Sequence, residues 1–171
     1  VDTFIWAENY GEEHLWIIPK AKELGFEAID FAISNPYTFP TDKVKAELER
    51  VGIDCVCTTT LTLETNPISP DAEIRKAAVQ AMKKCVDICN ELGAPILGGV
   101  NYAGWGYLTK KPRTEQEWAW GVESMREAAE YAKETGDVQI CVECVNRFET
   151  HFLNIAEDAV QFCKDVGTGN M

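Results

Sequence analysis

The chain alternates short apolar runs with longer segments in which apolar residues recur every three or four positions. Short apolar runs bounded by glycine, proline or polar residues predict strands, and the longer periodic segments predict amphipathic helices. The predicted strands cover residues 1–7, 26–33, 53–59, 94–100 and 138–145. The predicted helices cover residues 12–24, 40–51, 69–92, 114–135 and 154–166.

Boundary residues support several of these helices. The sequence Ser-Pro-Asp at residues 69–71 combines a capping hydroxyl, a proline at the first helical position and an acid in the first turn. Thr114 and Glu117 form the capping-box pattern, and Asn154 is the predicted cap of the last helix. A glycine follows each predicted helix, as is common at helix C-termini.

Alternation of strand and helix with short connections predicts an α/β fold with a parallel sheet and helices outside it. Two architectures compete at this point. A doubly wound sheet of five strands fits 171 residues as they stand. A (β/α)8 TIM barrel needs about 250 residues, so residues 1–171 would be a partial barrel, a single domain forming its N-terminal five-eighths. Because the chain opens inside a strand-like segment and stops directly after a helix, both ends are expected to be cut.

Functional side chains of α/β proteins gather where the strands end. The residues at or just after the predicted strand ends are Trp6, Glu8, Asp30, Thr58 to Thr60, Asn101, Trp105, Glu143 and Glu149. No strand is followed by a G-x-G-x-x-G motif or a P-loop, so a nucleotide site has no support. The isolated pair Gly98-Gly99 is interpreted as close packing of the backbone.

The segment VECVNRFE, residues 142–149, places the carboxylate Glu143 within an apolar strand. Buried there, it would cost several kcal/mol unless something compensated its charge. Strand alternation puts it on the side opposite the aliphatic residues 138, 140 and 142, which suit helix packing. Glu143 is therefore either a metal ligand or general base in a barrel lumen, or one half of an internal salt bridge with Arg147 or with a lysine of a neighbouring strand.

Aromatic residues accompany these strand ends. Trp105 lies in the glycine-spaced loop NYAGWGY, and Trp6 and Tyr10 flank the end of the first predicted strand. Such side chains either stack on the apolar face of a sugar or anchor their loop on the core. Of the two histidines, His14 is expected to face solvent and His151 is a weaker site candidate. Two histidines cannot supply a multi-histidine metal cluster.

Composition and net charge argue against several classes of binding partner. The net charge is −12, which disfavours nucleic acid and anionic membrane surfaces. No apolar run approaches the roughly 20 residues that a membrane span needs. Seven cysteines, an odd number, do not suggest a disulfide framework, so they are expected to be reduced, mostly buried small hydrophobes in a cytoplasmic protein.

The segment CVECVNRFE resembles the fifth-strand motif of the ketose 3-epimerases, a family of xylose isomerase-like barrels. The resemblance extends in order over nearly the whole chain. Its other parts are LGFEAIDFA, SPDAEIRKAA, LGAPILGGVNYAGW and VESMREAAEYAKETG. It implies a divalent metal, usually Mn²⁺ or Co²⁺ and sometimes Mg²⁺, at the barrel mouth, and an assembly of dimers or tetramers.

Residue by residue, the resemblance makes Glu143 a metal ligand and catalytic carboxylate. It makes Glu149 and Trp105 contacts of the sugar, while Trp6 or Tyr10 corresponds less well to the family's first-strand aromatic. Arg147 would help to organise the end of the strand and the sugar. The family's other metal ligands, an aspartate, a histidine and a second glutamate, have no counterpart within these 171 residues.

The implied reaction is C3 epimerisation of a free ketohexose. One carboxylate removes the C3 proton, a cis-enediolate forms, and a second carboxylate returns a proton from the other face. Three alternatives remain: another sugar isomerase or an inosose dehydratase-like enzyme on the same barrel, a catalytically incomplete half-barrel that self-associates, and an endonuclease IV-like enzyme. The charge of −12 and the presence of only two histidines argue against the last.

Overall fold

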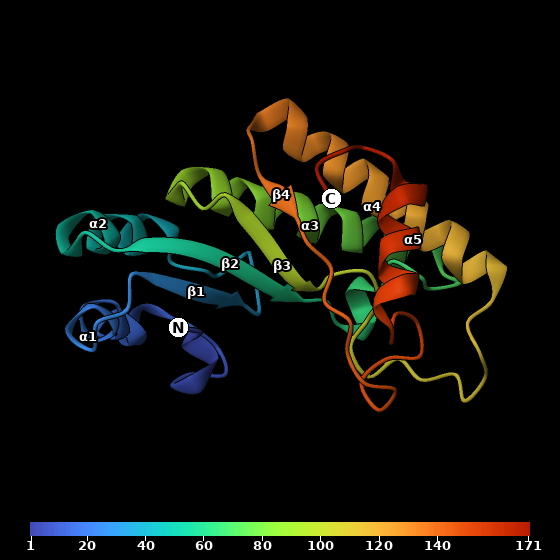
Figure 1. Ribbon diagram of the computed structural model, residues 1–171, viewed down its shortest axis with the longest axis horizontal. Coiled ribbons are helices and arrows are strands. Elements are labelled where there is room, and N and C mark those ends of the chain that lie inside the picture. The colour runs from blue at the N-terminus through green and yellow to red at the C-terminus, as the bar shows by residue number, and fades with distance from the viewer.

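The computed structural model describes residues 1–171 and has one parallel sheet of four strands in consecutive order (Figure 1). The strands are β1 (Ala28–Ile33), β2 (Asp54–Thr60), β3 (Ile96–Val100) and β4 (Gln139–Ile140). The α-helices are α1 (Ile17–Glu23), α2 (Thr41–Val51), α3 (Ala72–Leu92), α4 (Glu115–Thr135) and α5 (Ala156–Val166). Three 3₁₀ turns, Thr3–Ile5, Glu12–His14 and Leu63–Thr65, complete the elements.

The two faces of the sheet differ in burial, and this decides between the two architectures. Along β1 and β2 every second side chain is buried, beginning with Ile29 and Cys55, and the residues between them are partly or fully exposed. A doubly wound sheet would be covered on both faces and would not run in sequential strand order. Consecutive parallel strands with helices on one face are the arrangement of a TIM barrel. The chain is therefore a partial (β/α)8 barrel, as predicted, and its concave face is the face of the lumen.

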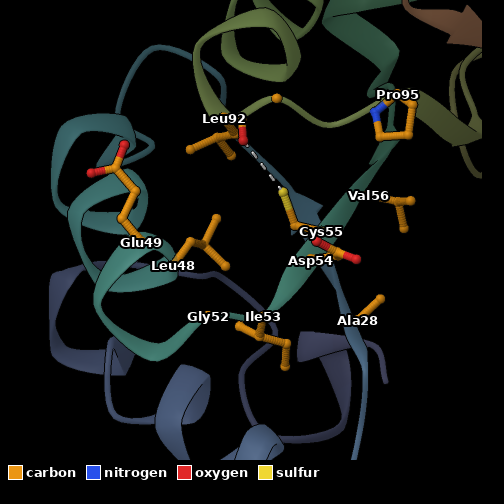
Figure 2. Close-up of a pocket in the computed structure, with 11 residues that line it drawn as sticks. Ala28, Leu48, Glu49, Gly52, Ile53, Asp54, Cys55, Val56, Leu92 and Pro95 are labelled. Carbon is orange, nitrogen blue, oxygen red and sulfur yellow. Dashed lines mark hydrogen bonds between the residues drawn. The ribbon is translucent and has the colours of Figure 1, made fainter.

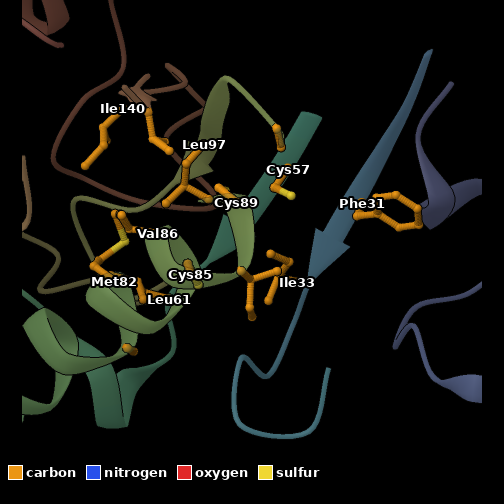
Figure 3. Close-up of a cluster of buried hydrophobic side chains, with 14 of the residues drawn as sticks. Phe31, Ile33, Cys57, Leu61, Met82, Cys85, Val86, Cys89, Leu97 and Ile140 are labelled. Atoms are coloured by element: carbon orange, nitrogen blue, oxygen red, sulfur yellow. The ribbon is translucent and has the colours of Figure 1, made fainter. Parts of the chain in front are cut away.

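The core lies between the sheet and the helices, chiefly α3 (Figure 3). Leu97 of β3 and Cys57 of β2 meet Met82, Cys85 and Cys89, which lie one helical turn apart on α3. These side chains are almost completely shielded from solvent. The three- and four-residue spacing in the sequence is thus the stripe by which α3 packs on the strands.

The first predicted strand, residues 1–7, is wrong in most of its length. Only the first two residues pair with the outer edge of β1: the Val1 amino group donates to the Ala28 carbonyl at 2.9 Å, and Asp2 forms a bridge with Asp30. The chain then turns into the 3₁₀ segment Thr3–Ile5 because the Asp2 carboxylate accepts a hydrogen bond from the Phe4 N–H at 2.7 Å. A local cap of this kind competes with strand pairing.

The fifth predicted strand, residues 138–145, is also shorter than expected, since only Gln139–Ile140 is regular. The N–H groups of Cys141 and Glu143 still donate to Leu97 and Gly99 of β3, at 2.9 and 3.1 Å. The Cys141 carbonyl, however, accepts a hydrogen bond from the Asn101 side chain at 2.9 Å. The segment thus continues beside β3 with one-sided pairing as far as Glu143.

The helix starts are close to prediction with three corrections. The predicted start of α3 at Ser69 is too early, because Asp71 is the cap and its carboxylate accepts from the Glu73 N–H at 2.9 Å. Ser69 lies before the helix, where its hydroxyl accepts from the Asp71 N–H at 3.1 Å. The first helix opens as a 3₁₀ turn and becomes α-helical at Ile17, which places Pro19 in the first turn, where proline is tolerated. Asn154 does not cap α5, because Ile155 occupies the cap position. The Asn154 amide instead donates to the carbonyls of Val145 and Thr150, both at 2.9 Å. None of the helices combines the length and apolar character that crossing a membrane requires.

Candidate active site

Glu143 lies at the carboxyl end of β4, and its backbone is fixed on both sides. Its N–H donates to the Gly99 carbonyl at 3.1 Å, and its carbonyl accepts a hydrogen bond of 2.7 Å from the Tyr102 hydroxyl. Tyr102 is completely buried, and burial raises the pKa of its hydroxyl, so this donor stays protonated. The position of Glu143 is therefore set by a buried anchor and not by its own side chain.

The Glu143 side chain points to the concave face, as alternation predicts. Gln139, Cys141 and Glu143 are exposed, whereas Val138 and Ile140 are buried. Glu143 forms no salt bridge with Arg147 or with any lysine. Within residues 1–171 the internal salt bridge is therefore absent, and the carboxylate is exposed to solvent on the open lumen face.

Asp30 is a second carboxylate on the concave face. Burial, followed by repulsion from Asp2, raises the pKa of the Asp30 carboxyl to about 6. The Thr58 hydroxyl lowers it in part, and Glu143 adds a smaller repulsion across the sheet. One Asp30 oxygen is buried without a hydrogen-bond partner. The lumen face therefore carries acidic groups on β1 and after β4, at opposite sides of the four strands.

The loop that carries Trp105 is held by its backbone. The Trp105 N–H donates to the Leu61 carbonyl at 2.8 Å, and the Gly104 N–H donates to the Asn66 side chain at 2.9 Å. A Cβ at Gly104 would lie 2.6 Å from the Thr62 carbonyl oxygen, so the loop sits directly on that backbone. The Trp105 side chain is 52% exposed. It is therefore not the core anchor of its loop, and it is free to contact a ligand.

Glu149 lies next to this loop. The Gly106 N–H donates to the Glu149 carbonyl at 2.8 Å, and one carboxylate oxygen of Glu149 accepts from the Asn146 amide at 2.8 Å. The structure thus brings Trp105 and Glu149 to the same end of the sheet as Glu143.

No hydrogen bond or ion pair joins Trp6 or Arg147 to these three residues. Trp6 follows the 3₁₀ turn beside β1 and packs partly against the core. It therefore lies beside the β1 edge of the sheet, and Glu143 follows β4 at the other edge. Arg147 is exposed and lines a separate pocket with Lys110, Lys111 and His151.

Sequence reasoning missed the pair formed by His151 and Glu117. One ring nitrogen of His151 lies 3.0 Å from the Tyr107 carbonyl oxygen, and the other lies 3.2 Å from a Glu117 carboxylate oxygen. The side chains are 10% and 9% exposed. The capping-box pattern had identified Glu117 only as part of a helix start, which it also is, since it accepts from the Thr114 N–H at 2.7 Å.

A second cavity and the seven cysteines do not add residues to this candidate site. A cavity of about 540 Å³ lies between the first residues of β2 and the ends of α2 and α3 (Figure 2). Because Glu143 follows the carboxyl end of β4, this cavity lies at the opposite end of the strands. All seven cysteines are free, and burial encloses four of them: Cys55, Cys57, Cys85 and Cys89. In residues 1–171 no group of three or more His, Cys, Asp or Glu side chains could hold a metal ion.

The match to known proteins covers most of the chain. Residues 18–171 match the model of the xylose isomerase-like TIM barrel family, and the chain belongs to this family. It is 32% identical to the D-psicose 3-epimerase of Ruminiclostridium cellulolyticum, over 97% of this chain and 58% of the relative. It is 26% identical to the ketose 3-epimerase of Arthrobacter globiformis, over 98% of this chain and 57% of the relative.

Solved structures give the same result. The D-allulose 3-epimerase from Methylomonas sp. superposes with a TM-score of 0.93 at 25% identity, over 99% of this chain and 59% of the other. The D-psicose 3-epimerase from Clostridium cellulolyticum H10, solved with D-tagatose, gives a TM-score of 0.86 at 27% identity, over 99% and 60%. The chain thus spans rather more than half the length of the relatives it matches.

Proposed function

We propose that the full-length protein is a metal-dependent ketose 3-epimerase. The observation that carries this proposal is the position of Glu143, exposed on the concave face at the carboxyl end of β4, with Trp105 and Glu149 at the same end. The similarity to relatives named D-psicose and ketose 3-epimerase supports it. Because this chain covers only part of those relatives, the activity belongs to the protein as a whole.

In the proposed reaction Glu143 is one of two carboxylates that exchange the C3 proton of a ketose. Its oxygens are free of ion pairs, so they can take the proton from one face of the sugar. A carboxylate on the opposite face then returns a proton to the cis-enediolate. Trp105 offers a half-exposed ring to the apolar face of the sugar. Glu149, Arg147 and Trp6 would complete the substrate contacts.

Glu143 also fits a divalent metal, because carboxylate oxygen is a preferred ligand of Mn²⁺ and Mg²⁺. It supplies one ligand, so the other ligands would come from residues beyond these 171. Bound there, Mn²⁺, or Co²⁺ or Mg²⁺ in its place, would polarise the ketose oxygens and make the C3 proton more acidic.

The test is epimerisation of D-fructose by the full-length protein, followed as exchange of the C3 hydrogen in D₂O by NMR. Removal of metal with EDTA should abolish the exchange, and Mn²⁺ should restore it. Glu143→Gln should lower kcat by about 10³-fold, as expected for loss of a general base.

Glu134→Gln is the matched control, because Glu134 is an exposed carboxylate at the end of α4 with no bonded partner. It should retain full activity. Full activity of Glu143→Gln with bound Mn²⁺ would overturn the proposal. Turnover of inosose but not of fructose would favour the dehydratase-like alternative.

A further inference from the structure

A pocket of about 490 Å³ lies between the loop after β3 and the segment after β4. Lys110, Lys111 and Arg147 line it together with His151, and none of the seven lining residues carries a carboxylate. In a chain whose net charge is −12 this is an unusual local concentration of positive charge. The positive charge of the pocket acts over a short range, because charges more than about 8 Å apart are largely screened at physiological ionic strength.

The cations of this pocket have no partners within the chain. Ten of the sixteen lysine and arginine side chains donate hydrogen bonds, to carboxylates or to backbone carbonyls. The six that do not are Lys45, Lys84, Lys110, Lys111, Arg147 and Lys164. Half of these unpaired cations therefore converge on one pocket.

Glu117 and Asp158 do not line the pocket, but they bond residues in it or next to it, and both are already engaged. One Glu117 oxygen faces His151 at 3.2 Å, and the other accepts from Thr114 at 2.7 Å. Asp158 takes two hydrogen bonds from Arg113, at 2.5 and 3.0 Å. These bonds also join α4, α5 and both loops around the pocket. Lys110, Lys111 and Arg147 are exposed to solvent around this pocket and form no ion pair with these carboxylates.

The pocket adjoins the residues assigned to the sugar. Arg147 is two residues from Glu149, and Leu108, another lining residue, is three residues from Trp105. Because the chain extends at most about 3.6 Å per residue, the Cα atoms of Arg147 and Leu108 lie no more than roughly 7 and 11 Å from those of Glu149 and Trp105. That is close to the reach of a phosphate on the terminal carbon of a ketose.

We propose that the pocket formed by Lys110, Lys111 and Arg147 binds the phosphate group of a phosphorylated ketose. The proposal rests on the proposed function and extends its substrate class from free ketoses to their phosphate monoesters. A phosphate carries a charge of about −1.5 to −2 at pH 7. Arginine binds it through two parallel N–H groups, and lysine binds it as a point charge.

The experiment measures binding of inorganic phosphate and of a ketohexose 6-phosphate to the full-length protein by isothermal titration calorimetry. The test variant is K110Q/K111Q. The matched control is K45Q/K84Q, which removes the same charge from two unpaired lysines outside the pocket. Both ligands should bind the parent protein and the control. K110Q/K111Q should weaken both by at least about tenfold, the loss expected when one charge-assisted hydrogen bond is removed.

A second readout compares kcat/KM for the phosphorylated and the free ketose. The parent should prefer the phosphorylated sugar, and K110Q/K111Q should lose that preference while its turnover of the free ketose is unchanged. Equal binding by the two double variants would overturn the pocket assignment. Binding of inorganic phosphate without preference for the phosphorylated ketose would overturn its assignment to a substrate.

Different results would overturn the epimerase proposal and the phosphate-pocket proposal. Epimerisation of free ketose without phosphate binding removes only the phosphate pocket. Lysine-dependent phosphate binding without epimerisation of any ketose removes the proposed function, and with it the sugar substrate assigned to the pocket.

Discussion

Gly99 is the residue at which the end of β3 depends most on having no side chain. Its φ of +106° is a conformation that other residues rarely adopt, and a Cβ there would lie 2.3 Å from the Thr59 carbonyl oxygen of β2. Gly99→Ala should therefore lower the free energy of unfolding by about 2–4 kcal/mol, measured by urea denaturation. The carbonyl that Gly99 offers to Glu143 would shift with it.

Gly98→Ala is the adjacent control, because a Cβ at Gly98 meets its nearest neighbour, a Thr58 methyl group, at 3.4 Å. It should change stability by less than about 1 kcal/mol. Equal losses for the two variants would contradict this account of Gly99. The sequence had already indicated close packing for this glycine pair, but it could not say which glycine makes the close approach.

Asp30 gives a prediction about pH. Burial raises the pKa of its carboxyl to about 6 in the folded protein, above the value of about 3.9 in an unfolded chain. Because the folded state holds a proton that the unfolded state releases, the free energy of unfolding should fall as pH rises from about 4 to about 6. Asp30→Asn should remove this fall and stabilise the protein at pH 7 by about 1 kcal/mol, a value reduced for partial solvent screening.

Urea denaturation at several pH values between 4 and 7 tests this, with Asp54→Asn as the control. Asp54 is exposed at the start of β2 on the same face. An unchanged pH dependence in Asp30→Asn would show that Asp30 is not the group responsible.

At the scale of elements, the start of α4 carries two linked roles. Thr114→Ala removes the helix cap and should cost about 1 kcal/mol. Glu117→Ala should cost more, about 2–3 kcal/mol, because it also leaves His151 without its carboxylate partner. Urea denaturation compares the two. Thr109→Ala is the control, because it removes only solvent-exposed hydrogen bonds with the Lys111 backbone, and it should cost less than about 0.5 kcal/mol. Equal costs for Thr114→Ala and Glu117→Ala would mean that the contact with His151 adds no stability.

The helices were the most predictable elements because their signals are local. The apolar stripe of α3 and the capping box of α4 both lie within a few residues of one another, and both are present in the structure. The strands at the two edges were predicted too long. Pairing of residues 1–7 and 138–145 depends on neighbours distant in sequence. The first segment is turned away by its own Asp2 carboxylate, which bonds the Phe4 N–H. In the last segment the Cys141 carbonyl bonds the Asn101 amide, 40 residues away in sequence.

The difference between local signals and contacts distant in sequence also decided which features of the candidate site could be predicted. Alternation within one strand correctly gave the side to which Glu143 points. The pocket that Arg147 lines could not be predicted in this way, because two loops distant in sequence form it. The anchor of Glu143 by Tyr102 was missed for the same reason, since 41 residues separate the two.

At the scale of the whole molecule, the sheet is open at both edges. Val1 and Asp2 cover part of the outer edge of β1, and Asn170 accepts one hydrogen bond from Ile140 at the outer edge of β4. The concave face that carries Glu143 and Asp30 is largely exposed. Open edges and an unfilled lumen favour association with further strands.

We therefore expect the protein made by its source organism to be larger than 19.1 kDa. A barrel of about 290 residues would add about 110 to 120 residues, or about 12 to 14 kDa, and would supply the remaining metal ligands and the second carboxylate. Intact-mass spectrometry tests the size, and sedimentation tests the assembly, for which dimers or tetramers are expected. A natural mass of 19.1 kDa would require two chains to join in forming each site. A monomer of that mass that epimerises a ketose would contradict both the closed barrel and the metal-dependent reaction, because a single chain of residues 1–171 offers no complete metal site.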